Sequence, residues 1–194
     1  MKKGVLYTVF ILMLLSVSGC GYNKMQANEE AVKAAWGDVE ATYQRRSDLI
    51  PNLVEVVKGY AAHEKETLEA VTEARAKVGT IQMSKDLLNN PEAFARFQNA
   101  QSAMSSALSR LMVVVEKYPD LKANQNFQDL QHQLEGTENR ITVARVRYNE
   151  AVAVYNTSIR IFPNVLTNKF LLHLNPREPF KADAGAEKAP QVKF

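Results

Sequence analysis

Apolar residues recur three and four positions apart along most of this chain, starting near Glu29. Over residues 29–78 the two steps alternate without a slip, and this spacing places side chains in one stripe along a helix that faces a partner. The stripe consists of Val32, Trp36, Val39, Tyr43, Arg46, Ile50, Leu53, Val57, Tyr60, Glu64, Thr67, Val71, Ala74 and Val78. The pattern therefore predicts one long helix over this segment.

Pro51 lies inside that predicted helix. Proline has no backbone N–H to donate, so we expect a kink or a brief break near residues 47–51, where Ser47 or Asp48 can cap a new helix start. The stripe keeps its register past Pro51, which favours a second piece nearly collinear with the first. A chain that folded back there would instead give a four-helix bundle.

Two further helices follow, over residues 91–118 and from Asn126 to the Phe162-Pro163 pair. Asn90 and Pro91 are a typical cap and first residue, and Pro119 ends the earlier of the two. A single helix cannot bury its own apolar stripe, so three helices with stripes of matching period must pack against one another. The sequence therefore predicts an all-α fold, an elongated antiparallel bundle of three long helices with the first kinked near Pro51.

The N-terminus has the layout of an export signal: Lys2 and Lys3 precede an apolar run over residues 5–17. The tetrad Val17-Ser18-Gly19-Cys20 resembles the bacterial lipobox, whose cysteine receives a diacylglyceryl group and becomes the new N-terminus. The alternative is an apolar helix that is never cleaved and spans the membrane. Because of the positive-inside rule, both alternatives put the chain after Cys20 on the extracytoplasmic face.

The lipoprotein interpretation predicts lipidation at Cys20 and a periplasmic or cell-surface location, with the outer membrane possible because Gly21 follows the cysteine. Cleavage before Cys20 leaves 22 of the 24 lysines and arginines against 21 aspartates and glutamates. This near-neutral balance does not favour nucleic acid as a partner. Cys20 is the only cysteine, so neither a disulfide nor a thiolate metal site is available.

The predicted organisation has five parts. The C-terminal stretch Asn164 to Leu174 is amphipathic, and we expect it to cap the open end of the bundle; the alternative is that it enters lipid. The residues after it are rich in proline, charge and small side chains, which is typical of disorder. The parts are a signal peptide (1–19), a lipidated anchor and short tether (20–28), the helical bundle (29–163), the amphipathic segment (164–174) and a disordered tail (175–194).

Catalytic and metal-binding motifs do not emerge from the sequence. His63-Glu64 resembles the start of a zinc-protease signature, but the second histidine that the motif needs is replaced by Thr67. His132 and His173 do not have the spacing of metal ligands. We therefore predict no catalytic residues, no metal, no cofactor and no small-molecule substrate.

Charged residues inside the apolar stripe are the candidate interaction site. Arg46 and Glu64 occupy stripe positions, where an unpaired charge would cost several kcal/mol to bury. Each must pair with a residue on another helix, reach solvent or meet a second molecule. We favour interhelical pairing that fixes the register of the bundle, and the next alternative is that Arg46 extends its charged end to solvent. Arg45 and Asp48 lie beside it at the predicted kink, and together these four residues form the predicted interaction site.

Long runs of this sequence resemble the bacterial LemA family. They cover residues 45–75, 107–124, 134–145 and 148–151, then Phe162-Pro163 and residues 185–190. The resemblance implies a helical protein that faces outward from a membrane, usually through an N-terminal spanning segment, and that has no agreed biochemical activity. Some relatives are associated with the formation of membrane-bound organelles. This chain departs from the pattern in carrying a lipobox.

These observations predict a membrane-anchored helical lipoprotein of the cell envelope that acts as a non-enzymatic scaffold or protein-interaction module. Its expected partners are membrane lipid, through acylated Cys20, and envelope proteins or further copies of itself. A bilayer-binding or membrane-remodelling module that uses residues 164–174 is the first alternative. An envelope hydrolase is the second.

Overall fold

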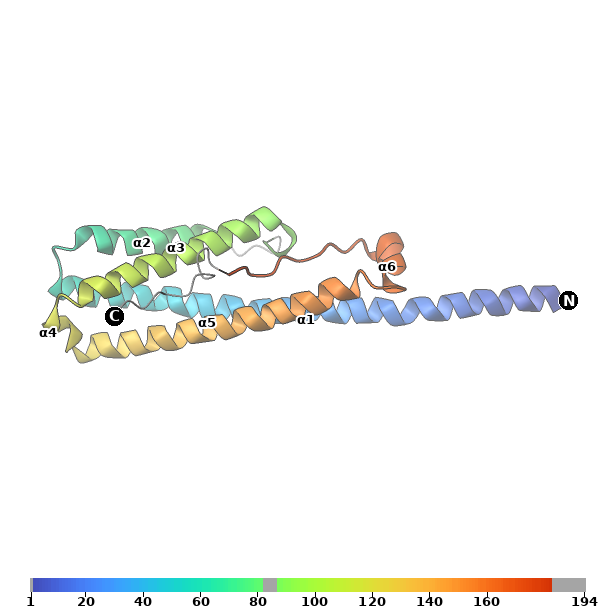
Figure 1. Cartoon of the computed structure of the whole chain (residues 1–194), viewed down its shortest axis with the longest axis horizontal. Helices are drawn as coiled ribbons and strands as arrows, with labels where there is room; N and C mark the ends of the chain where they lie inside the picture. The colour runs from blue at the N-terminus through green and yellow to red at the C-terminus, as the bar shows by residue number, and fades with distance from the viewer. Residues whose placement is uncertain (1, 82–86, 183–194) are drawn as a thin grey trace, which may run out of the picture. The chain divides into compact units, whose positions relative to one another are not determined.

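The computed structural model describes residues 2–81 and 87–182, and their side chains from Gly21 onward. Within these ranges the chain is helical and contains no strand, which confirms the predicted all-α helical bundle (Figure 1). The elements are α1 (Lys2–Tyr60), α2 (Lys65–Thr80), η1 (Leu87–Asn89), α3 (Pro91–Val115), α4 (Pro119–Lys122), α5 (Gln125–Ser158), α6 (Asn164–Thr167) and η2 (Asn168–Leu172).

The chain divides into two compact units, and α1 and α5 contribute residues to both. Unit 1 comprises Met1–Ala41 and Thr142–Pro179. Unit 2 comprises Thr42–Ile141 and the chain from Phe180 onward.

Unit 2 is a bundle of four helical segments: the end of α1, then α2, α3 and the start of α5. Figure 1 shows α2 and α3 side by side. One apolar core joins all four segments, because the buried side chains that the sequence spaces three and four apart on each helix meet there. Its largest fully buried members include Ile50, Leu53, Met104, Leu111 and Phe127.

Helix α1 continues through Pro51, so the brief break that was one of the two alternatives for residues 47–51 is absent and the second piece continues the first helix. Proline at this position cannot donate to the carbonyl oxygen of Ser47, four residues earlier. Arg75 of α2 donates to that oxygen instead, from Nε at 3.2 Å. The freed acceptor is therefore satisfied from the neighbouring helix, and the break that proline would otherwise favour is not needed.

The first break in the predicted helix falls at residues 61–64, where the chain turns back into α2. Ala61 and Leu68 are buried on the two sides of this turn, whereas Tyr60, a predicted stripe residue, is half exposed. At the turn, burial thus moves by one position, from Tyr60 to Ala61 and from Thr67 to Leu68, and it returns to the predicted stripe at Val71. Doubling back buries Leu68 and Val71 in the same core as Val57, which a straight helix could not do.

In unit 1 the first part of α1 packs on the last part of α5. The rings of Trp36 and Tyr148 meet edge to face with centroids 5.3 Å apart. Met25 is fully buried although it lies in the predicted short tether, so helical packing begins within residues 20–28. In the part of the chain whose side chains the structure describes, no helix combines the length and the apolar character that crossing a bilayer requires.

Residues 175–182 also differ from the sequence prediction, which placed them in a disordered tail. The hydroxyl groups of Tyr148 and Tyr155 donate to the backbone oxygens of Glu178 and Asn175, each at 3.1 Å. Arg177 is buried, and its Nη2 lies 2.8 Å from Oε1 of Glu29 on α1. These bonds hold an extended segment against α1 and α5 in unit 1. The rest of the predicted tail, residues 183–194, lies outside the described residues.

The amphipathic segment contains α6 and η2, and most of its apolar side chains are exposed. Asn164 is the one buried residue of these two elements. The sequence predicts that this segment caps the bundle, with entry into lipid as the alternative. The structure instead leaves Val165, Leu166, Phe170 and Leu171 in contact with solvent.

Candidate functional site

Arg46 is the buried charge at the centre of unit 2. Its side chain is 2% exposed, and the guanidinium lies 5.1 Å from the centre of the Tyr43 ring. Nη1 donates to Oε1 of Glu138 on α5 and to Oγ of Ser105 on α3, both at 2.9 Å. Nη2 donates to the side-chain and backbone oxygens of Gln101, also on α3. One side chain therefore links α1, α3 and α5.

The energetic balance of this cluster depends on complete pairing. A buried guanidinium carries a large desolvation cost, which is offset when charged and neutral acceptors take up its donors. Glu138 supplies the charge and remains 40% exposed, so it keeps part of its hydration while neutralising Arg46. Arg46 thus pairs with residues of two other helices, as its position in the stripe predicted.

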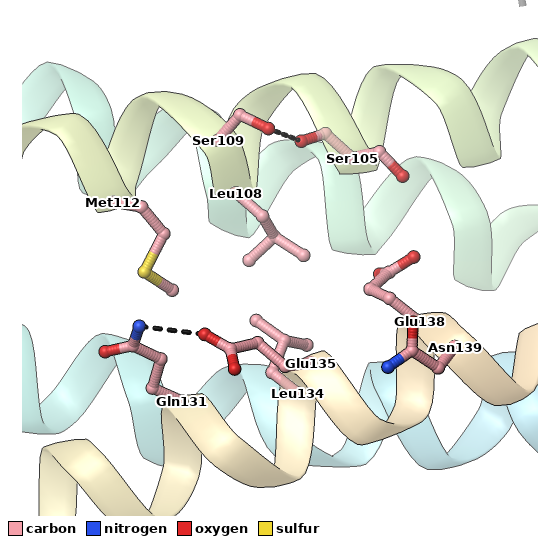
Figure 2. A pocket seen from close by; sticks show the side chains of 9 residues that line it. All are labelled: Ser105, Leu108, Ser109, Met112, Gln131, Leu134, Glu135, Glu138 and Asn139. Carbon is pink, nitrogen blue, oxygen red and sulfur yellow. Dashed lines mark hydrogen bonds between the residues drawn. The ribbon is translucent and has the colours of Figure 1, made fainter.

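A groove of about 510 Å³ lies between α3 and α5, and Glu138 belongs both to it and to the Arg46 cluster. Figure 2 shows the side chains of the two helices facing each other across the opening. Leu108, Met112 and Leu134 supply apolar surface. The remaining lining residues are polar: Ser105, Ser109, Gln131, Glu135, Glu138 and Asn139.

Hydrogen bonds within the bundle hold several polar groups of the groove. Ser105 Oγ accepts from Arg46, and Ser109 Oγ donates to the backbone oxygen of Ser105 at 2.9 Å. Gln131 Nε2 donates to Glu135 at 2.9 Å. Neither serine contacts a histidine base, which nucleophilic catalysis would need. Across the described residues, no group of three or more His, Cys, Asp or Glu side chains could hold a metal ion.

The structure does not bring the four predicted interaction residues together. Arg46 points into the bundle, whereas Arg45 and Asp48 are exposed, and Asp48 accepts from Gln44 at 2.7 Å. Glu64 lies in the turn before α2, where it accepts from the hydroxyl of Tyr118 at 3.1 Å. Partial burial and then this bond raise the pKa of Tyr118. Glu64 thus has its own partner, away from Arg46.

Cys20, the predicted lipidation site, lies in α1 among the residues whose side chains the structure does not describe. The apolar run over residues 5–17 lies there as well.

Sequence reasoning missed Gln101, Ser105 and Glu138. One signal was available for Gln101, which occupies an apolar stripe position in α3 and has Ser105 one helical turn later. Glu138 lies next to Thr137, another polar residue in a stripe. A buried arginine that needs a carboxylate could have been matched to these interruptions, but nothing in the sequence gives the helix pairing.

Comparison with known proteins gives two findings. A family model described as LemA family matches residues 35–194. The chain is also similar to Magnetosome protein MamQ 2 of Paramagnetospirillum magneticum, at 27% identity over 83% of this chain and 67% of the relative. It is 28% identical to Magnetosome protein MamQ of Magnetospirillum gryphiswaldense over 73% of this chain and 58% of the relative. Protein LemA of Metamycoplasma hominis is 25% identical over 82% of this chain and 72% of the relative.

Proposed function

This chain belongs to the LemA family, and from that premise we propose that it is a membrane-anchored helical protein of the cell envelope that binds other proteins and catalyses no reaction. The anchor in this proposal is a lipid on Cys20. Its support is the lipobox-like sequence that ends at Cys20 and the similarity to relatives named as magnetosome proteins, since a magnetosome is a membrane-bound organelle.

The groove between α3 and α5 is the observation that carries the binding role. It combines an apolar base with amide, hydroxyl and carboxylate groups, which is the mixture found where one protein recognises a segment of another. Met112 adds an adaptable side chain of the kind that promiscuous protein-binding surfaces use. The Arg46 cluster holds both walls in place, so the surface exists before a partner arrives.

The proposed occupant is a segment of another envelope protein or of a second copy of this chain. A partner helix or extended strand can place an apolar side chain between Leu108 and Leu134 while its polar groups meet Gln131 and Asn139. The rim carries two carboxylates, Glu135 and Glu138, and Arg46 already neutralises the second. A segment that offers lysine or arginine to Glu135 would fit this charge best.

Photo-crosslinking in intact cells tests the proposal. A photoreactive residue at position 112 lies in the groove, and one at position 113 is the matched control because Val113 is exposed on the same helix outside the groove. We expect a discrete protein adduct from position 112 and little from position 113. An adduct of twice the chain mass identifies self-association. Equal labelling from both positions, or none from either, contradicts binding at the groove.

A further inference from the structure

Unit 1 carries a dense group of exposed apolar side chains on the connection between α5 and the C-terminal segment. The group consists of Ile161, Phe162, Val165, Leu166, Phe170 and Leu171, and we call it the apolar loop. Phe162 is 78% exposed and Phe170 is 70% exposed. Soluble surfaces rarely gather large apolar side chains in this way unless the patch contacts a partner or a membrane.

The apolar loop is held against α1 through the contact of Asn164 with Gly21. Asn164, which opens α6, lies directly on Gly21. A Cβ atom at Gly21 would be 3.7 Å from the Cα of Asn164 and closer still to its amide, so no side chain fits between them. Asn164 is buried there, and its Nδ2 donates to the backbone oxygen of Ser158 at 3.0 Å. The loop is thereby fixed beside Gly21, the neighbour of Cys20.

Both chain segments at this contact lack acidic residues. Residues 1–28 contain no aspartate or glutamate, and neither do residues 151–177. Lys24, Arg160 and Lys169 supply positive charge, and the Lys169 ammonium lies 5.9 Å from the centre of the Phe170 ring. Tyr22 on α1 is exposed as well. Cations and aromatic rings around an apolar group are the composition that the interface of a bilayer selects.

We propose that the apolar loop inserts its side chains into the bilayer that holds the anchor, which gives unit 1 a second attachment to the membrane beside Cys20. The proposal rests on the membrane anchoring proposed above, because the anchor brings Gly21 to the bilayer surface. A lipid on Cys20 and an uncleaved apolar helix over residues 5–17 have the same consequence here. A lipid surface is favoured over a second protein because the anchor supplies it at this place, with headgroups that attract the surrounding cations.

Fluorescence quenching by brominated lipids tests the proposal on the full chain. The protein is reconstituted into vesicles of phosphatidylcholine and phosphatidylglycerol, with and without bromine on the acyl chains. Two variants each carry one new tryptophan in addition to the native, buried Trp36. The new tryptophan is Phe170→Trp in the apolar loop or Val146→Trp on the exposed face of α5 in the same unit. Both positions are exposed, so neither substitution disturbs packing.

The added emission of the F170W variant should shift to shorter wavelength and lose most of its intensity in brominated vesicles, whereas that of the V146W variant should not. Flotation of the same vesicles reports the anchor separately. If the protein floats and both variants are quenched equally or not at all, the loop does not enter the bilayer and the anchor stands. If the parent chain does not float with vesicles, the anchoring and this proposal fail together.

Discussion

Glu138 lies 2.9 Å from Nη1 of Arg46, and this ion pair joins α5 to α1 across 92 positions of sequence. The same guanidinium reaches Gln101 and Ser105 on α3. The cluster is therefore a structural link whose exposed carboxylate also forms part of the groove surface. The ion pair and the proposed binding groove therefore share one residue, Glu138.

Replacing Glu138 with alanine should lower the free energy of unfolding by about 2 kcal/mol, because a buried guanidinium loses its countercharge. In an Arg46→Met background the same substitution should cost much less, since no buried charge remains to be left unpaired. Chemical denaturation of the detergent-solubilised protein measures both values. Asp48→Ala, at an exposed carboxylate on the helix that carries Arg46, is the control. Equal losses in the two backgrounds would show that Arg46 and Glu138 are not coupled.

Arg75→Ala should cost about 1 kcal/mol, because the carbonyl oxygen of Ser47 then loses its donor. Pro51→Ala restores a backbone N–H that can bond to Ser47, so the effect of Arg75→Ala should shrink in that background. Thermal unfolding of the four combinations measures the coupling. Lys77→Ala, on the same helix as Arg75, is the control: its effect on the free energy of unfolding should be the same with and without Pro51. A loss from Arg75→Ala that is independent of Pro51 contradicts this account of the uninterrupted helix.

Local sequence chemistry predicted where α3 and α5 begin, whereas both end three or four residues earlier than expected, at Val115 and Ser158. The helix at Pro91 begins as expected because Asn90 Oδ1 accepts from the backbone N–H groups of Glu92 and Ala93 at 3.0 and 3.1 Å. The turn at residues 61–64 had no comparable local signal. It depends on the register shift that buries Leu68 and on the bond between Glu64 and Tyr118, 54 positions apart. Tertiary contacts of this kind are invisible to periodicity alone.

In the candidate site, too, local sequence signals were predictable and tertiary contacts were not. A charge in an apolar stripe identified Arg46 from sequence, but its partners lie 55 to 92 positions away on helices whose pairing the sequence does not give. Composition likewise predicted disorder from Asn175 onward. Hydrogen bonds from Tyr148, Tyr155 and Asn156 hold the backbone of residues 175–178, and these tyrosines read as core residues in the sequence.

Gly21 and Gly37 lie in the same helix and should respond to alanine in opposite ways. At Gly21 the new methyl group meets Asn164, so we expect a loss of about 1–2 kcal/mol from overpacking. At Gly37 no atom lies within reach of a Cβ, so alanine should stabilise the helix by about 0.5–1 kcal/mol. Unfolding curves for both variants test the contact. A stabilising Gly21→Ala would remove the evidence that Asn164 packs against α1.

Burial raises the pKa of the Tyr148 hydroxyl. An unfolded tyrosine releases its proton near pH 10, at about its ordinary pKa, while the folded protein retains it. Above that pH the unfolded state binds fewer protons, so the free energy of unfolding should fall as pH rises. Tyr148→Phe should make the free energy of unfolding fall less steeply with pH. The variant also lacks the hydrogen bond to the backbone oxygen of Glu178, so it should be less stable than the parent at neutral pH. Denaturation between about pH 8 and 11 measures the two slopes, and equal slopes for the parent and the Tyr148→Phe variant would contradict this account.

Acylation at Cys20 should appear as incorporation of radioactive palmitate that the Cys20→Ala variant loses. The sulfur of Cys20 is the only thiol that can take a diacylglyceryl group, since the chain has one cysteine. Ser16→Ala, just outside the lipobox-like tetrad, should retain the label. Label that persists in the alanine variant contradicts lipidation at Cys20. If the parent chain is unlabelled and its mass shows that residues 1–19 are retained, the anchor is the uncleaved helix. In that case Gly21 and the apolar loop would still lie at the bilayer surface.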